Sequence, residues 1–150
     1  MRFFHISDLH FGKLLYGYDL TEEHRNFIEQ LGDYCDKYNP DAVLIAGDVY
    51  DRSVPSADAM TLLDELLNKL SGRKVFIISG NHDNAKRLSF GKDFLKKHDI
   101  YISTVPPTGE NEKIEKVKFA DEYGNVNVYM LPFLKPALFK NSMPEEAVTG

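Results

Sequence analysis

The chain has 150 residues, of which 43% are hydrophobic and 27% are charged, and this composition excludes a disordered or a fibrous chain. The formal net charge of −5 gives no support to a nucleic-acid partner, so support for any such function has to come from a site. The single cysteine, Cys35, excludes an intrachain disulfide. The sequence shows no leader pattern and no apolar run long enough to span a bilayer, which favours a cytoplasmic protein without membrane contact.

The first half of the chain predicts alternating strands and helices. Apolar runs predict buried strands, and apolar residues at helical spacing predict the helices between them. Strands are expected over 2–7, 42–46 and 74–79, with a loop over 8–18 after the first strand. The first helix is capped by Asp19 or Thr21 and ends at Asn39-Pro40. The second helix begins at Pro55 and ends at Ser71-Gly72. This order predicts an α/β fold with parallel strands and right-handed crossovers.

The second half changes character. Residues 88–97 predict a third, shorter helix, and residues 100–103 a further strand. Alternation of apolar and polar residues around Phe119 and Val128 then predicts an antiparallel β-hairpin with a five-residue connection, Asp121 to Asn125. From position 132 onward no element is predicted to be completed, which favours a natural or cut fragment of a larger domain.

Three loops carry the side chains with reactive chemistry, and each follows a predicted buried strand. In an open α/β sheet, ligands bind beyond the carboxyl ends of the strands, and parallel strands place those ends at one edge. We therefore expect these groups to converge: Asp8 and His10 after the first strand, Asp48 after the second, and Asn81, His82 and Asp83 after the third.

Carboxylate, amide oxygen and imidazole together favour borderline divalent ions such as Mn²⁺, Fe²⁺ or Zn²⁺. A carboxylate can also bridge two ions about 3.5–4 Å apart, as two-metal hydrolases require. Asp48, on the middle loop, is our choice for the bridge. Asp8 and His10 would complete the ligands of the first ion on this half, and Asn81 would bind the second ion.

A separate role is predicted for His82, which could donate a proton to a leaving oxygen or stabilise the charged transition state. Asp83 could hold the other nitrogen of that imidazole and so fix its orientation. Gly47 and Gly80 would supply tight turns just before the ligands.

Several residues have two interpretations. His5 is predicted as a packed core residue or one that orients a ligand, and Asp51 as a residue that orients a ligand or caps a turn. Arg52 could contact phosphate or water, and His24 and His98 are interpreted as ordinary surface or packing residues. Asp-x-His or Gly-Asp alone would be weak signals, but all three motifs in order, each after a buried strand, favour a functional site.

The motifs Asp8-Leu-His10, Gly47-Asp-Val-Tyr-Asp51 and Gly80-Asn-His-Asp83 resemble those of the calcineurin-like metallophosphoesterases. The flanking stretches, above all Gly80-Asn-His-Asp-Asn-Ala-Lys-Arg-Leu-Ser-Phe-Gly91, resemble the SbcD family of bacterial nuclease subunits within that superfamily. The resemblance covers essentially the whole chain.

This resemblance implies the N-terminal half of a four-layer α/β/β/α sandwich, here βαβαβ followed by a hairpin, with residues 1–150 as the first part of the nuclease domain. It implies two Mn²⁺ ions (with Mg²⁺, Fe²⁺ or Zn²⁺ left open), cleavage of DNA ends and hairpins, an SMC-like ATPase partner of the SbcC kind, and a homodimer. The residues that match the family's metal ligands are Asp8, His10, Asp48 and Asn81, and His82 matches its catalytic histidine.

The chain departs from the family pattern in one respect. The family completes its site with three further histidines, whereas this sequence has no histidine after His98. We therefore expect these 150 residues alone to bind Mn²⁺ weakly and to have little nuclease activity. The alternatives to a DNA nuclease are a phosphoesterase acting on small phosphodiesters or phosphoproteins, and a scaffold without catalysis.

Overall fold

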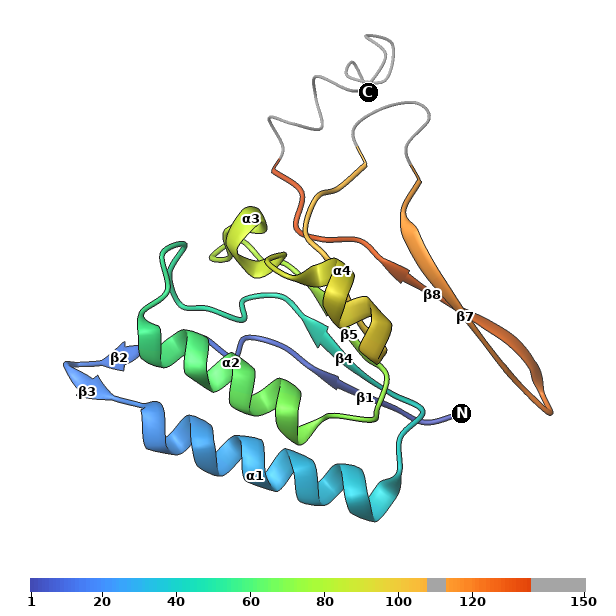
Figure 1. The fold of residues 1–150 in the computed structure, drawn as a ribbon, viewed down its shortest axis with the longest axis horizontal. Helices are drawn as coiled ribbons and strands as arrows, with labels where there is room; N and C mark the ends of the chain where they lie inside the picture. The colour runs from blue at the N-terminus through green and yellow to red at the C-terminus, as the bar shows by residue number, and fades with distance from the viewer. Residues whose placement is uncertain (108–112, 136–150) are drawn as a thin grey trace, which may run out of the picture.

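The computed structural model describes residues 1–107 and 113–135, and its centre is a parallel sheet of four short strands (Figure 1). The spatial order matches the chain order: β1 (Phe3–Ile6), β4 (Ala42–Ala46), β5 (Val75–Ile78) and β6 (Ile100–Ser103). All neighbouring pairs are parallel, as predicted. The carboxyl ends of β1, β4 and β5 therefore meet at one edge of the sheet.

Alternate residues of the strands face two separate cores. Val43, Ile45, Val75 and Ile77 pack in the larger core, against α1 (Thr21–Tyr38) and α2 (Ala57–Lys69). Their neighbours in sequence, such as Phe76, belong to a smaller core on the other face. A strand that is buried on both faces has apolar residues at nearly every position, and these strands show that pattern.

The second face of the sheet is covered by the hairpin of β7 (Glu115–Asp121) and β8 (Gly124–Met130). The Phe119 ring contacts those of Phe3 and Phe76 edge-on, with centroids 5.1 and 5.8 Å apart. Helices, parallel sheet and hairpin thus form three successive layers (Figure 1), which confirms the predicted α/β class and the order βαβαβ followed by a hairpin.

Two features of the first half differ from the prediction: the start of a helix and the content of a loop. Helix α2 begins at Ala57 and not at Pro55, because the Ser56 hydroxyl accepts a hydrogen bond from the Ala59 amide and caps the helix. The loop predicted over 8–18 contains two short antiparallel strands, β2 (Leu14–Leu15) and β3 (Tyr18–Asp19).

Two predictions in the second half were wrong in detail. The helix predicted over 88–97 is divided into α3 (Ala85–Leu88), α4 (Lys92–Leu95) and the 3₁₀ helix η1 (Lys96–His98), because Gly91 takes the left-handed φ of 73°. The hairpin connection has two residues and not five, since Asp121 pairs with Gly124 and its carboxylate accepts from the Tyr123 amide. Of the stretch predicted to lack elements, residues 136–150 lie outside the described residues.

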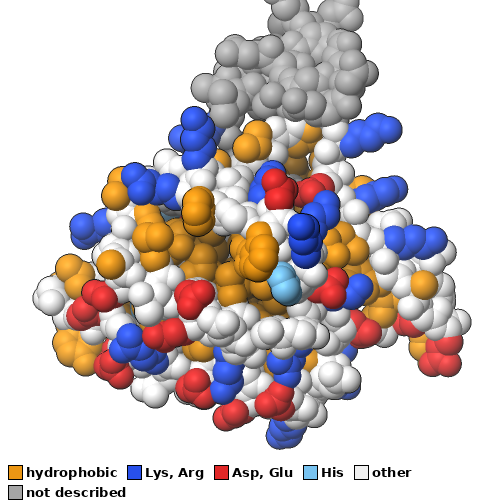
Figure 2. Space-filling model, viewed as in Figure 1, with side chains coloured by type: hydrophobic (Ala, Val, Ile, Leu, Met, Phe, Trp, Pro, Cys, Tyr) orange, Lys and Arg blue, Asp and Glu red, His pale blue; other side chains and the backbone are white. Residues whose placement is uncertain are grey.

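One face of the molecule carries a concentration of exposed hydrophobic side chains. Figure 2 shows them around the centre of the view, over the region of α2, α3 and α4, with charged side chains around them. Met60, Phe90 and Phe94 are 54%, 86% and 65% exposed, so burial of this face would remove large apolar side chains from water. Among the described residues, no helix is long and apolar enough to cross a membrane.

Candidate metal centre

The loops after β1 and β4 run side by side. The Asp8 amide donates to the Gly47 carbonyl over 3.1 Å, and the His10 amide donates to the Asp48 carbonyl over 2.9 Å. One residue further on, Phe11 donates to Val49 over 2.9 Å. These backbone bonds hold the first two motifs in register and bring Asp8, His10 and Asp48 together, as the sequence predicts.

The third loop packs directly on the second. The His82 amide donates to Asp48 Oδ1 over 2.9 Å, and a Cβ added at Gly80 would lie 2.1 Å from the same oxygen. The predicted tight turn is present at Gly47, whose φ is +88°. Gly80 is needed for a different reason, because a side chain there would occupy the space of the Asp48 carboxylate.

Three of the candidate ligands have left-handed backbone conformations: φ is 57° at Asp8, 47° at His10 and 51° at Asp48. Such residues cost about 1–3 kcal/mol each and persist only where their surroundings fix them, which is common at functional sites. The backbone bonds between the loops supply part of that fixation.

The donor atoms fit a divalent ion. His10 Nε2 lies 3.8 Å from Asp8 Oδ1 and 4.0 Å from Asp48 Oδ2. Two ligand atoms each about 2.1 Å from one ion are at most about 4.2 Å apart, so these separations suit a shared ion. One ligand atom from each of Asp8, His10 and Asp48 lies within 4.8 Å of the others. Carboxylate and imidazole ligands suit Mn²⁺, Fe²⁺ or Zn²⁺.

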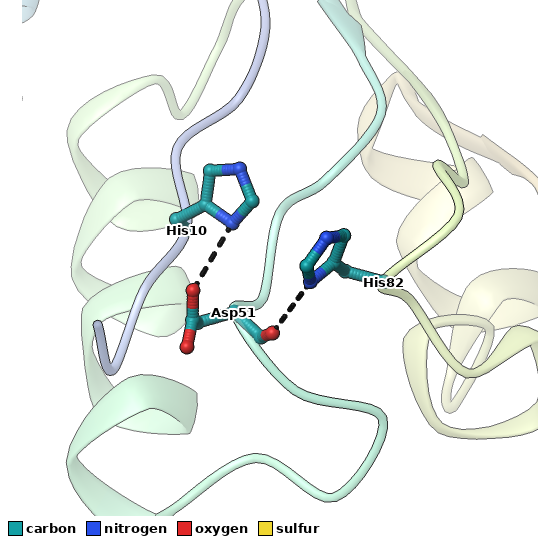
Figure 3. A group of neighbouring side chains, drawn as sticks. All are labelled: His10, Asp51 and His82. Atoms are coloured by element: carbon teal, nitrogen blue, oxygen red, sulfur yellow. Dashed lines mark hydrogen bonds and ion pairs between the residues drawn. The ribbon is translucent and has the colours of Figure 1, made fainter. Parts of the chain in front are cut away.

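Asp51 joins the two histidines of the site (Figure 3). Its carboxylate Oδ1 lies 3.3 Å from His10 Nδ1, and its backbone carbonyl oxygen lies 2.8 Å from His82 Nδ1. The two imidazole rings meet at nearly a right angle, with centroids 4.9 Å apart. His10 Nε2 lies toward the carboxylates of Asp8 and Asp48, while Nδ1 lies beside the Asp51 carboxylate but forms no hydrogen bond among the described residues. An outer carboxylate in this place can orient a metal-binding histidine.

The pKa of His82 is raised above its ordinary value. The hydrogen bond to the Asp51 carbonyl is the largest cause, partial burial opposes it, and the carboxylates of Asp48, Asp51 and Asp83 add to the rise. All of these polar groups favour the protonated ring, which can donate a proton.

Asp83 does not hold the imidazole of His82, and that predicted contact is wrong. Its carboxylate accepts hydrogen bonds from the backbone amides of Val49, Tyr50 and Gly80, at 3.2, 2.9 and 2.9 Å. The His82 ring is held instead by the backbone of Asp51. Asp83 thus ties the third loop to the second, and none of these backbone partners could be predicted from side-chain identities.

Replacing Asp83 by alanine is expected to lower the free energy of unfolding by about 3 kcal/mol, because three backbone amides lose a charged acceptor. Asp83→Asn, which keeps one acceptor oxygen, should lose less. Urea denaturation measures both changes. Asp33→Ala, at an exposed position on α1, should change stability by no more than about 0.5 kcal/mol. A cost for Asp83→Ala as small as that of this control would contradict the role assigned to the carboxylate.

The other candidates lie around this centre. The side chain of Asn81 is exposed and lines a hollow of about 480 Å³ together with Ser53 and Lys86. Arg52 is exposed, with Nε 3.8 Å from an Asp51 carboxylate oxygen.

His5 is exposed on the edge strand β1, so its prediction as a packed core residue was wrong. Phe3, at the same alternation on β1, is half-buried against Phe119, so alternation shows which face a residue lies on but not whether another element covers it there.

Residues 1–146 match the sequence profile of the calcineurin-like phosphoesterases. The chain is also 31% identical over 151 residues to the SbcD component of the nuclease SbcCD of Staphylococcus epidermidis. That similarity covers 99% of this chain and 38% of the relative, so the chain spans well under half the length of that protein.

Proposed function

The chain belongs to the calcineurin-like phosphoesterase family, and on this premise we propose that it is the N-terminal part of a metal-dependent nuclease that hydrolyses phosphodiester bonds in DNA. The observation that carries the proposal is the convergence of Asp8, His10 Nε2 and Asp48 at spacings that suit one divalent ion. Residues 1–150 would form the first part of the nuclease domain.

In this proposal, Asp8 and His10 bind a first ion, Asp48 bridges two ions and Asn81 binds the second. The ions, which we propose to be Mn²⁺ on the family resemblance, would stabilise charge that develops on the phosphoryl oxygens. The burial of Asp48, which is 9% exposed, supports the bridging role because its carboxylate has little competition from water. Asp51 and Asp83 would act as positioning residues, the first on the two imidazoles and the second on the loop backbone.

His82 is the proposed acid that acts on the leaving oxygen. Its Nδ1 is occupied by the Asp51 carbonyl, so Nε2 is the nitrogen left to face a substrate. The hydrogen bond with the Asp51 carbonyl and the nearby carboxylates of Asp48, Asp51 and Asp83 raise the pKa of this ring. The right-angle contact with His10 keeps the ring beside the proposed ions.

DNA is proposed as the substrate, and an SMC-like ATPase of the SbcC kind as the partner. Support comes from the similarity to a protein named as part of the nuclease SbcCD, and from the stretch Arg87-Leu-Ser-Phe-Gly91 that follows the third motif. The metal-binding motifs themselves suit any phosphoester, so they do not distinguish DNA from a small phosphodiester or a phosphoprotein.

The test is an assay of the full-length gene product that contains this chain, supplied with Mn²⁺. Linear duplex DNA, DNA hairpins, bis-p-nitrophenyl phosphate and a phosphopeptide are compared as substrates. Cleavage of DNA with the highest kcat/KM supports a nuclease. Faster turnover of the small diester or of the phosphopeptide would contradict the proposed substrate and leave a phosphoesterase of another specificity.

His82→Ala is expected to lower kcat on DNA by about 100-fold or more, because a general acid contributes about 10²–10⁴ to the rate. Its affinity for Mn²⁺ should stay within about threefold of wild type, since the proposed role of the ring is proton transfer and not metal binding. Single-turnover kinetics and calorimetric titration measure the two effects. His98→Ala, an exposed histidine on η1, is the matched control. An unchanged kcat in His82→Ala would contradict the role.

We further propose that two copies of the chain associate through the exposed apolar face over α2, α3 and α4 (Figure 2). The exposed side chains Met60, Phe90 and Phe94 belong to these helices or to the turn between α3 and α4. Phe94→Glu is expected to weaken self-association at least about tenfold, because it places a charge among apolar side chains that would be buried. Sedimentation velocity over a concentration series measures the change. Tyr123→Glu, at an even more exposed aromatic on the hairpin turn, should leave association unchanged. Equal behaviour of the two variants would exclude this face as the interface.

A further inference from the structure

Two of the hollows beside the proposed metal centre are lined mainly by carboxylates. One, of about 300 Å³, includes Asp51, and its other charged lining residues are Asp19, Arg52 and Asp58. The other, of about 440 Å³, includes Asp8 and Glu23, and no described lysine or arginine lines it. Carboxylates repel a phosphate group, so neither hollow suits a nucleotide that lies next to the scissile phosphate.

The hollow at Asn81 has the opposite charge. Its volume of about 480 Å³ is in the range of ligand-binding pockets, and its charged lining residues are Asp83, Lys86 and Lys135. The Asp83 carboxylate already accepts hydrogen bonds from three backbone amides. Both lysine side chains are exposed, so the hollow offers two ammonium groups against one carboxylate that is engaged elsewhere. This lining attracts a phosphate group.

Segments that are far apart in the sequence build this hollow, and they fix an aromatic residue beside it. The segment after β8 lies next to the segment after β6 (Figure 1). The Ser79 hydroxyl donates to the Thr104 carbonyl over 3.2 Å, and the Phe133 amide donates to the Ser79 carbonyl over 2.9 Å. Phe133 is nevertheless 44% exposed. An aromatic ring that is held by its backbone and open to water can stack on a nucleic-acid base.

We propose that this hollow is a subsite for one unpaired nucleotide next to the scissile phosphate. The Phe133 ring stacks on the base, and the ammonium groups of Lys86 and Lys135 bind a neighbouring phosphate. The inference rests on the proposed nuclease function. The nucleotide is unpaired because the bases inside a duplex stack on one another and leave no face free for a phenyl ring.

The subsite also gives the substrate strand a direction. Asn81, the proposed ligand of the second ion, lines the same hollow as Lys86 and Lys135. A nucleotide in the hollow is therefore adjacent to the second ion, and the strand leaves the metal centre on this side. The hollows at Asp8 and Asp51 lie off its path, because their carboxylates repel the phosphates.

The first test measures binding of oligothymidine and of a long linear duplex by the full-length gene product, without Mn²⁺ so that no strand is cleaved. Phe133→Leu loses the aromatic face, and Phe133→Tyr keeps it. We expect Phe133→Leu to bind oligothymidine about tenfold more weakly and the duplex within about threefold of wild type. Phe133→Tyr should stay within about threefold on both, as should the control Tyr123→Leu, at an exposed aromatic elsewhere. An equal loss in the Leu and Tyr variants, or on the two DNAs, would overturn the stacking.

The second test measures the salt dependence of oligothymidine binding. Replacing Lys86 and Lys135 by glutamine should make the slope of log K against log salt concentration shallower by about 0.7 for each lysine. Lys118→Gln, at an exposed lysine on β7, should leave the slope unchanged. Thermal unfolding shows whether each variant is folded, and if Phe133→Leu is not, the slopes decide. A wild-type slope in the double lysine variant would overturn the subsite.

Cleavage with Mn²⁺ separates the failure of the subsite from the failure of the proposed function. If wild type does not cleave DNA with a higher kcat/KM than bis-p-nitrophenyl phosphate, the nuclease function fails and the subsite fails with it. If wild type cleaves DNA as proposed, and both Phe133→Leu and the double lysine variant cleave oligothymidine with the kcat/KM of wild type, only the subsite fails.

Discussion

Asp48→Asn is expected to lower the affinity for Mn²⁺ by about 100-fold or more, since loss of a partner outside the ligand shell alone costs about 10–100-fold. The side chain is 12% exposed, and its Oδ2 lies 4.0 Å from His10 Nε2. Asparagine keeps the size and can still accept the hydrogen bond from the His82 amide, so the change removes mainly the charge and one ligand oxygen. Isothermal titration with Mn²⁺ measures the affinity.

The control for Asp48→Asn is Asp64→Asn, an exposed carboxylate on α2 that should leave the affinity unchanged. These 150 residues alone are expected to bind Mn²⁺ weakly. The affinity can still be measured, because titration at higher protein concentration detects millimolar dissociation constants. Equal and negligible binding in wild type and Asp48→Ala would favour the scaffold without catalysis. If wild type binds Mn²⁺ and the affinity is unchanged in Asp48→Asn and in Asp48→Ala, the ion binds at another site.

Gly80→Ala is expected to destabilise the fold by about 3 kcal/mol and to weaken Mn²⁺ binding with it. The added Cβ would lie 2.1 Å from Asp48 Oδ1 and 2.4 Å from the Asp48 backbone nitrogen. A backbone atom cannot move aside as a flexible side chain can, so the second and third loops must separate. That separation also breaks the hydrogen bond from the His82 amide to the Asp48 carboxylate.

The matched control is Gly72→Ala. Gly72 has a left-handed φ of +81° and no atom within 4 Å of an added Cβ, so its substitution tests backbone strain without a clash. Its cost should be about 1 kcal/mol. Urea denaturation of both variants separates the two effects. A cost for Gly80→Ala no greater than that of the control would mean that the two loops do not meet at Gly80 and Asp48.

The fold could be predicted from the sequence because its signals are local. Runs such as Val75–Ile78 are apolar at every position, which identifies strands covered on both faces, and the helices between them impose parallel pairing. The errors occurred where one residue decides the local geometry. Gly91 breaks a helix that periodicity alone would continue, and Ser56 starts one at a hydrogen bond that no periodicity shows.

The sequence by itself determined which groups meet, since Asp8, Asp48 and His82 follow parallel strands whose ends share one edge. Only the tertiary structure decided how these groups are held. The His82 ring is fixed by the carbonyl of Asp51, and Asp83 binds backbone amides instead of that ring. Every residue offers nearly the same backbone amide and carbonyl, so the sequence carries no signal for which of them a side chain will bind. That choice depends on how far the loops of distant segments approach one another.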